Sequence, residues 1–523
     1  MEFKADEVEA ILLSRYWLGR GLPQHGMLSG VGIRNPPGFP LLLLPLAALT
    51  SSPLSFGLYV AAFNVAALGL IFLAGRELGS PRAGWWACGF MAAHPWLVLY
   101  SRKIWAQSLL PFFVLLFLMV VARVGRRAGS KAIFWAFPLV SLIWQIHYSG
   151  YCVLAFFIVW FAFSARSRRV NWRAALAGFV VGAALLLPYL SYLKGNDFMD
   201  IRRSFRGRGG GGSEPWENLV GIVRSEAGTA FAGGFGYPFA AEMIPLSRTP
   251  PGRESPGLQP TALLSTALIL ILAGAGVFAG KGRADAAFSR WLFLFTLVPP
   301  VLYFIRGIKP PPHYFIVGIP AVLILAGLGM DNLLKWCYRP ENARQPGGET
   351  GRAAVRRSPL AKFRLASGLL APIAGMAVIF SGVAIWSSFI RYINRAGGTG
   401  GDYGLAYRVQ RRASRLLVEE RVPPPNIDAA LTRDGGLSIR YLVTEEISGH
   451  LAKRGSIRKN RTEPEAHDRE ISAFLNAKNK YARLIDTLLF PGRDCSPYRF
   501  ERIVRLAGPL KICLADLSPG AGK

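Results

Sequence analysis

The stretch 54–75 reads LSFGLYVAAFNVAALGLIFLAG and contains no charged residue. At 1.5 Å per residue, such a helix would be long enough to cross the roughly 30 Å hydrocarbon layer of a bilayer. Similar apolar stretches follow it along the chain. They lie near 84–100, 104–122, 132–146, 149–164, 174–193, 259–280, 290–306, 313–334 and 365–393. The sequence therefore predicts an all-α fold, a polytopic bundle of about ten transmembrane helices.

The composition agrees with this interpretation. Of 523 residues, 51% are hydrophobic and 18% are charged, against roughly 25% charged in soluble domains. These values and the long apolar runs exclude a soluble enzyme, a disordered chain and a coiled coil. The net charge of +30 would suggest a nucleic-acid partner in a soluble protein. Here most of the basic residues lie in loops between spans, so we expect membrane lipid and no nucleic acid as partners.

The distribution of basic residues predicts the orientation of the bundle. Short loops rich in Lys and Arg stay in the cytoplasm, and they alternate here with loops that are nearly free of them. The loop 335–364 belongs to the basic, cytoplasmic set. This places 1–36, the long loop 194–257 and the tail 394–523 on the extracytoplasmic side of a cell (plasma or inner) membrane.

These boundaries divide the chain into three parts, 1–36, 37–393 and 394–523. Residues 1–36 form a first extracytoplasmic loop with an amphipathic helix, and 37–393 form the bundle. The apolar segment Phe39–Thr50 is short and proline-rich, so we expect it to dip into the membrane without crossing. A first transmembrane helix would then be missing from the chain, because something must carry residues 1–36 across. If Phe39–Thr50 does cross, the N-terminus is cytoplasmic and no missing helix is required.

Residues 394–523 are polar, and we expect them to form a small extracytoplasmic α/β domain. Its predicted helices are 405–421 and 469–489, and its predicted strands are 437–443, 500–506 and 510–514. Cys495 and Cys513 both fall in this domain, on the oxidising side of the membrane. We therefore predict a disulfide between them.

Polar residues at the outer ends of spans are the candidates for chemistry. Asp6 and Glu7 could supply a general base or hold a metal, or could simply be favourable acids at a helix N-terminus. Arg102 and Lys103 lie in a short outer turn before a helix, a place that suits a phosphate. They could equally extend towards lipid headgroups.

His147, His313 and Tyr314 lie at two further outer turns. Together with Tyr148 they could bind an anionic headgroup or move a proton. The alternative is that they are hydrogen-bonded residues of the membrane interface, where tyrosine is common. Cys and His residues do not occur at the spacing of a zinc site, so we predict no metal ligands.

Several motifs resemble those of a known family, and their order along the chain carries the resemblance. They are Asp6-Glu7, Asn35-Pro36-Pro37-Gly38-Phe39, Gly75-Arg76-Glu77-Leu78-Gly79, Tyr100-Ser101-Arg102 and Pro312-His313-Tyr314-Phe315. Over roughly residues 3–335 the chain resembles the membrane glycosyltransferases with the GT-C fold. More narrowly, it resembles the group of dolichyl-phosphate-mannose protein mannosyltransferases and bacterial lipid A aminoarabinose transferases.

The resemblance implies an inverting transfer of one sugar from a polyprenyl-phosphate donor to an acceptor glycan, lipid or protein at the extracytoplasmic face. By the same resemblance, Asp6 is the candidate general base and Glu7 its neighbour. The candidate donor-phosphate ligands are Arg102, Lys103, His147, His313, Tyr314 and Arg34.

The chain departs from the family pattern in three places. The family's first transmembrane helix is absent, Asn35 stands where the aminoarabinose transferases have a lysine, and Gln107 stands where many members have an acid. The last departure predicts chemistry without a metal or other cofactor.

A multi-spanning transporter or lipid flippase is the alternative function. Such a protein should carry ionisable residues at mid-membrane or paired broken helices in repeated halves. The acids and histidines of this chain instead gather near one face, which favours the transferase.

Overall fold

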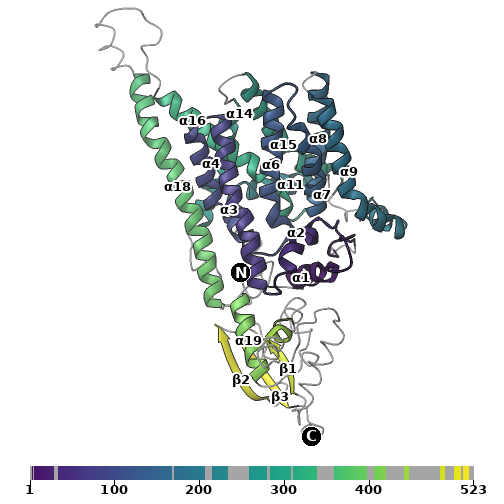
Figure 1. Cartoon of the computed structure of the whole chain (residues 1–523). Coiled ribbons are helices and arrows are strands. Elements are labelled where there is room, and N and C mark those ends of the chain that lie inside the picture. The colour runs from purple at the N-terminus through teal and green to yellow at the C-terminus, as the bar shows by residue number, and fades with distance from the viewer. Residues whose placement is uncertain are drawn as a thin grey trace, which may run out of the picture.

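The computed structural model describes residues 3, 5–28, 33–167, 170–205, 215–233, 258–278, 283–307, 310–338, 359–396, 406–419, 441–446, 483–488, 500–507 and 510–516. Long helices pack side by side into a bundle, and smaller elements gather at one end of it (Figure 1).

In the described part of the chain, eight helical segments are long and apolar enough to cross a membrane. They are α3 (Pro53–Leu78), η1 with α6 (Ala106–Arg126), η2 with α8 (Tyr148–Arg166), α9 (Trp172–Gly195), α14 (Leu258–Val277), α15 (Arg283–Ile305), α16 (Ile319–Cys337) and α18 (Pro359–Ala396). This array is that of a multi-pass membrane protein.

Two of the ten predicted spans are shorter than the length that crossing requires. The helix α4 (Pro81–Ala93) ends at His94, and α5 (Pro95–Tyr100) begins after it. Proline lacks an N–H and biases the preceding residue towards extended backbone, and His94 accordingly has ψ 114°. The helix α7 (Ile133–Ile146) has 14 residues, or about 21 Å. Ten complete spans are therefore not confirmed.

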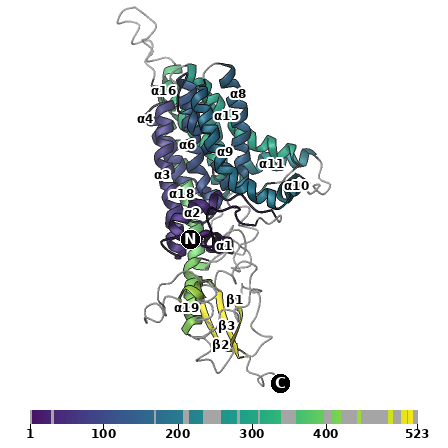
Figure 2. The ribbon, with the colours of Figure 1, turned by 45° about the vertical axis from the view of Figure 1, so that its right-hand side comes forward.

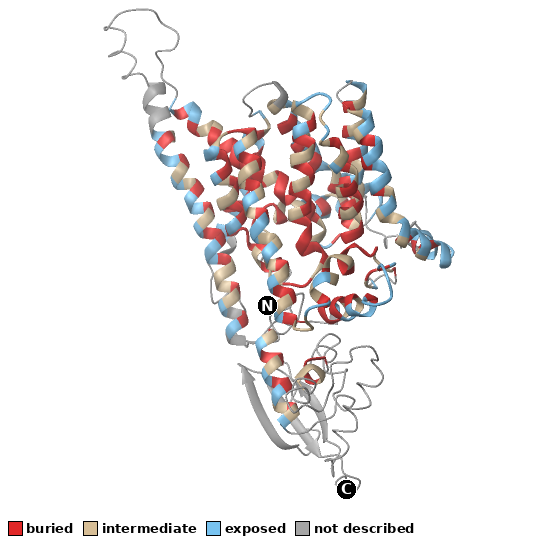
Figure 3. Ribbon diagram, in the orientation of Figure 1, coloured by how far each residue is buried: buried red, intermediate tan, exposed pale blue. Residues whose placement is uncertain are grey.

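The bundle is apolar both inside and on its outer surface. Large exposed side chains such as Leu176 and Phe179 on α9 and Leu369 and Phe380 on α18 face outwards, where lipid would cover them. Figure 3 shows this exposure along α9 and α18 and burial at the centre. In water such surfaces would drive aggregation, so this pattern indicates a lipid environment.

The first loop lies at one end of the bundle, which we call the α1 end. It forms α1 (Ala5–Trp17), and α2 (Gly38–Ala47) follows it. The ten residues of α2 reach about 15 Å, too short to cross. Both helices lie at the end of the bundle that faces α19 (Tyr407–Glu419) and the sheet (Figures 1 and 2). The α1 end therefore collects parts of the first loop and of the tail.

The long loop contributes α10 (Met199–Phe205) and α11 (Pro215–Thr229). The helix α11 packs against α15 and against η4 (Pro312–Val317), a 3₁₀ helix that precedes α16. Part of the long loop therefore lies directly against the turn that carries His313.

The tail contains α19, a helical segment at 441–446 and three strands. Strands β1 (Arg483–Leu488), β3 (Leu510–Asp516) and β2 (Phe500–Ala507) form an antiparallel sheet in the order β1-β3-β2. The helix α19 and the hairpin of β2 with β3 lie where the sequence predicts them.

Two predictions for the tail are wrong. Residues 441–443 are helical rather than extended, and 483–488 form β1 instead of the end of a helix over 469–489. Short apolar runs do not distinguish helix from strand by their pattern alone. The rest of both segments lies outside the described residues, as does Cys495. The disulfide and the grouping of 394–523 as one domain therefore stay predictions.

Candidate functional site

The turn after α5 places one lysine inside the protein. The turn is closed by backbone hydrogen bonds from the Arg102 N–H to the Leu99 carbonyl and from the Lys103 N–H to the Tyr100 carbonyl. The Lys103 side chain is only 1% exposed. Its Nζ lies 4.1 Å from the ring centroid of Trp105 and 5.7 Å from that of Tyr100, within cation–π range. A charged group is thus held in a buried, aromatic environment.

The turn between α7 and η2 holds His147 in a fixed orientation. Its Nδ1 accepts a hydrogen bond from the Ser149 N–H at 3.1 Å, and its Nε2 lies 3.0 Å from the side-chain amide of Gln107. The Ser149 hydroxyl oxygen also lies 2.9 Å from the same Nδ1. Ser149 and Gln107 therefore engage both ring nitrogens of His147.

The 3₁₀ helix η4 brings His313 and Tyr314 to the same place. The His313 ring lies 5.4 Å from the Trp105 ring, and the Tyr314 ring lies 5.0 Å from the His147 ring. Three turns that are distant in sequence thus meet in a group that we call the turn cluster. It consists of Tyr100, Lys103, Trp105, Gln107, His147, His313 and Tyr314.

Both histidines of the turn cluster are neutral at physiological pH. Burial lowers the pKa of His147 to about 3, with a smaller contribution from His313. Burial and, to a smaller extent, the neighbouring Lys103 charge lower the pKa of His313 to about 3. The cluster therefore offers one ammonium group and two neutral imidazoles. Of these, His313 can donate a hydrogen bond to an anion, whereas Ser149 and Gln107 engage both ring nitrogens of His147.

Arg102 lies apart from the turn cluster. It lines a narrow hollow against α18, beside Trp386 and Phe389. Arg34 approaches the cluster through its backbone, since its carbonyl oxygen accepts a hydrogen bond from the Tyr148 hydroxyl at 2.9 Å. The geometry therefore favours Lys103 over Arg102 as the cation of the cluster, with Arg34 nearby.

The two acids of the first loop lie on different sides of α1. Asp6 is exposed, whereas Glu7 is completely buried. Successive residues on a helix point about 100° apart, so one carboxylate of such a pair faces inwards when the other faces out. The helix α1 packs on α2, and α2 packs on α7, which leads to His147. Through these contacts the helix that carries Asp6 is linked to the turn of His147.

Glu9 is a further acid on α1, and it does not belong to the motifs of the sequence. Its Oε1 accepts a hydrogen bond from the Leu28 N–H at 3.1 Å, and burial raises its pKa. The charges of Asp6 and Arg34 also act on its pKa. The signal that could have identified Glu9 is its spacing of three residues from Asp6, which places both on one side of a helix.

Glu226 on α11 is a second missed acid. It lies near enough to Cys152 at the start of α8 to act on it electrostatically, and burial raises the Glu226 pKa to about 8. Most of this carboxyl is protonated at neutral pH. The available signal was its spacing of four residues from Ile222, which is buried on the same side of α11.

Over the described residues, no group of three or more His, Cys, Asp or Glu side chains is placed to hold a metal ion. Metal independence stays a prediction about the reaction.

No family model matches the chain, and no curated protein matches it in sequence. Among solved structures, the apo form of ArnT from Cupriavidus metallidurans is similar, with a TM-score of 0.52 at 13% sequence identity. The match covers 99% of this chain and 94% of that one. ArnT is a lipid A aminoarabinose transferase with the GT-C fold. This chain has the GT-C fold. The predicted resemblance is thus confirmed at the level of fold.

Two further matches with the GT-C fold have lower TM-scores. ArnT from Cupriavidus metallidurans bound to undecaprenyl phosphate gives 0.49 at 13% identity, covering 99% of this chain and 95% of that one. The apo oligosaccharyltransferase of Archaeoglobus fulgidus gives 0.41 at 15% identity, covering 84% and 55%. At such identities the likeness establishes the fold, and the reaction must be argued from the residues.

Proposed function

We propose that this GT-C protein is a glycosyltransferase that moves a sugar from a polyprenyl-phosphate donor to an acceptor at the extracytoplasmic face. The observation that carries the proposal is the turn cluster, which holds a buried lysine among aromatic rings and neutral imidazoles. Within the described residues it lies at the ends of apolar helices, where the phosphate of a membrane-embedded lipid would be located.

Lys103 is suited to bind the donor phosphate. A phosphate leaving group gains negative charge as the bond from the sugar to its oxygen breaks, and a nearby ammonium stabilises that charge. The attraction is strong because the site is buried and poor in water. His313 and Tyr314 would add neutral hydrogen-bond donors, and Arg34 a second charge. His147 would release its Gln107 partner to take part.

Asp6 is the proposed general base. The acceptor hydroxyl would attack the anomeric carbon from the side opposite the phosphate, so that its proton passes to the Asp6 carboxylate and the configuration inverts. The sugar then leaves the carrier, which departs as polyprenyl phosphate. Asp6 is exposed on α1, which packs on α2, and this exposure is consistent with meeting an acceptor from outside the membrane. The complete burial of Glu7 makes it a neighbour rather than the base.

The carrier class is inferred from the fold and from the chemistry of the site. ArnT from Cupriavidus metallidurans, whose fold this chain shares, binds undecaprenyl phosphate. We infer a carrier of that class, an acceptor glycan, lipid or protein, and no metal or other cofactor. The basic loops further predict a plasma or inner membrane location with the tail outside the cytoplasm.

The test is sugar transfer in membranes, with labelled polyprenyl-phosphate sugars as donors, comparing the intact chain with Asp6→Asn and Glu7→Gln. We expect Asp6→Asn to abolish transfer at normal protein levels and Glu7→Gln to retain more of it. Unchanged transfer by Asp6→Asn would remove Asp6 as the base. Transfer by none of the proteins from any donor would favour a transporter.

A further inference from the structure

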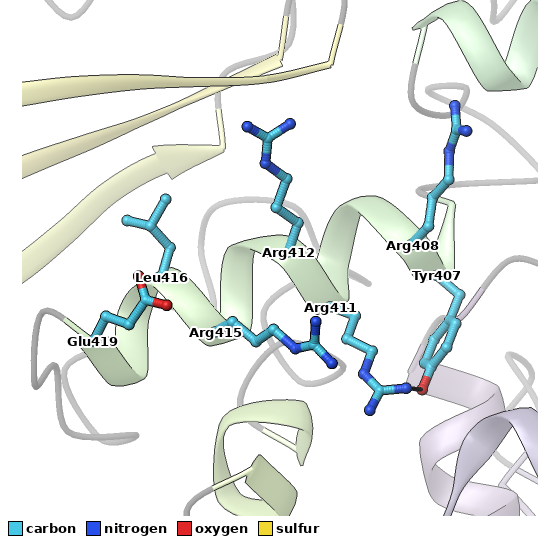
Figure 4. A pocket seen from close by; sticks show the side chains of 7 residues that line it. All are labelled: Tyr407, Arg408, Arg411, Arg412, Arg415, Leu416 and Glu419. Atoms are coloured by element: carbon cyan, nitrogen blue, oxygen red, sulfur yellow. Dashed lines mark hydrogen bonds between the residues drawn. The ribbon is translucent and has the colours of Figure 1, made fainter.

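The helix α19 carries a hollow of about 640 Å³. Its lining residues are Tyr407, Arg408, Arg411, Arg412, Arg415, Leu416 and Glu419. Figure 4 shows that the arginines form two rows, with Arg408 and Arg412 along one edge and Arg411 and Arg415 along the other. Within each row the residues are one helical turn apart.

Among the described residues, the apolar contacts of α19 do not involve these arginines. The core contacts of α19 come from Val409, Ala413 and Leu417, which are buried at spacings of four residues. Like charges three or four residues apart destabilise a helix. A helix that needed only to pack in this place would not gain from four arginines within eight positions. Their presence indicates a ligand of opposite charge.

The guanidinium groups can still bind such a ligand. Arg408 donates to the Asn394 carbonyl, and Arg415 pairs with Glu446 at 3.5 Å. A guanidinium has five N–H donors, so one such contact leaves others for an anion. The planar group also matches the oxygens of phosphate, sulfate and carboxylate in pairs.

The hollow adjoins the start of α1. The Phe3 ring meets the Tyr407 ring edge-on at 5.9 Å, and the Gln410 amide donates to the Phe3 carbonyl. Phe3 precedes Asp6 by three residues, so the arginine rows lie beside the segment that positions the proposed base. The helix α19 lies farther from the bundle than α1 (Figures 1 and 2). This position suits a saccharide that projects from the membrane better than the headgroup of a bilayer phospholipid.

We propose that the two arginine rows bind the anionic groups of an acidic glycan, and that this glycan is the acceptor of the transferred sugar. The identification of the ligand as the acceptor rests on the proposed function. The anion site itself does not, because binding can be measured without donor or turnover.

The first experiment measures binding of dextran sulfate and of neutral dextran to the purified full-length protein in lipid nanodiscs. The double variant Arg408→Gln/Arg412→Gln removes both positive charges of one row, and both positions are exposed. The variant Arg166→Gln/Arg173→Gln makes the same charge change at exposed positions outside the tail. We expect the first variant to bind dextran sulfate about tenfold more weakly and the second to bind as the intact protein does. Neutral dextran should bind to none of them.

Equal binding by all three proteins would overturn the anion site. Binding to vesicles of phosphatidylglycerol in phosphatidylcholine, without binding to dextran sulfate, would overturn the glycan as ligand.

Once an acceptor is in hand, the variant Arg408→Gln/Arg412→Gln should raise the KM for that acceptor with little change in kcat. Loss of dextran sulfate binding with an unchanged KM would overturn the acceptor assignment alone. If Asp6→Asn loses transfer but still binds dextran sulfate, both the proposed base and the anion site are supported, because the two assays are independent.

Discussion

Replacing Lys103 by methionine removes the ammonium and keeps an unbranched side chain of similar length. The size of the effect depends on the environment of the charge. An ion pair at 4 Å contributes about 1 kcal/mol in bulk water and about 4 kcal/mol at the effective dielectric constant of a partly buried site. Because Lys103 is 1% exposed, the second value applies to a phosphate oxygen about 4 Å from its Nζ. Since 1.36 kcal/mol corresponds to a factor of ten, kcat/KM should fall by about a thousandfold.

The assay is the initial rate of sugar transfer from a labelled polyprenyl-phosphate sugar by protein reconstituted in vesicles. Lys131→Met is the matched control, because it makes the same change at an exposed position in the loop that precedes α7. It should leave the rate unchanged. Arg102→Met should cost less than Lys103→Met, because Arg102 lines the hollow against α18. A loss of less than about fivefold in Lys103→Met, with normal folding, would refute the assignment of Lys103 to the donor phosphate.

Three further predictions concern packing, pH and metal. A Cβ at Gly329 would lie 1.8 Å from the Leu272 carbonyl oxygen, so Gly329→Ala should lower the thermal midpoint by several degrees, whereas Gly274→Ala, with open space around it, should not. The folded-state pKa values of His147 and His313, about 3, lie below the unfolded value of 6.5. Their burial therefore favours folding above pH 6.5 and progressively less as the pH falls, so thermal stability should decline from pH 6.5 towards 3, and less steeply in His313→Gln. A chelator such as EDTA should leave sugar transfer unchanged, and loss of transfer that added Mg²⁺ or Mn²⁺ restores would contradict metal independence.

Much of the bundle could be predicted from the sequence because apolar length and charge bias act locally. A run such as 54–75 has few alternatives to a membrane span once its length and lack of charge are known. Two of the predicted spans are too short because of local backbone chemistry. Pro95, for example, holds His94 in extended backbone, so that α4 ends at Ala93. In the tail, short apolar segments allowed either helix or strand, and 483–488 was decided by pairing with β3, a partner that is distant in sequence.

The site was only partly predictable for a similar reason. Sidedness alone places alternate turns at one end of a bundle, and the structure brings Lys103, His147 and His313 together there. Sequence could not tell which of two adjacent cations turns inwards, because that depends on the backbone angles of the turn. The rotation of α1 about its own axis, which exposes Asp6 and buries Glu7, likewise depends on the helices that α1 packs against.

The central claim is that the protein breaks the bond between a sugar and a polyprenyl phosphate. The most direct measurement is the release of free polyprenyl phosphate from its sugar conjugate by the reconstituted protein, in the presence of extracted membrane acceptors. Our account predicts that the released phosphate equals the sugar transferred, mole for mole, and that Lys103→Met suppresses both. Movement of the intact conjugate across the vesicle membrane, without release of polyprenyl phosphate, would contradict it.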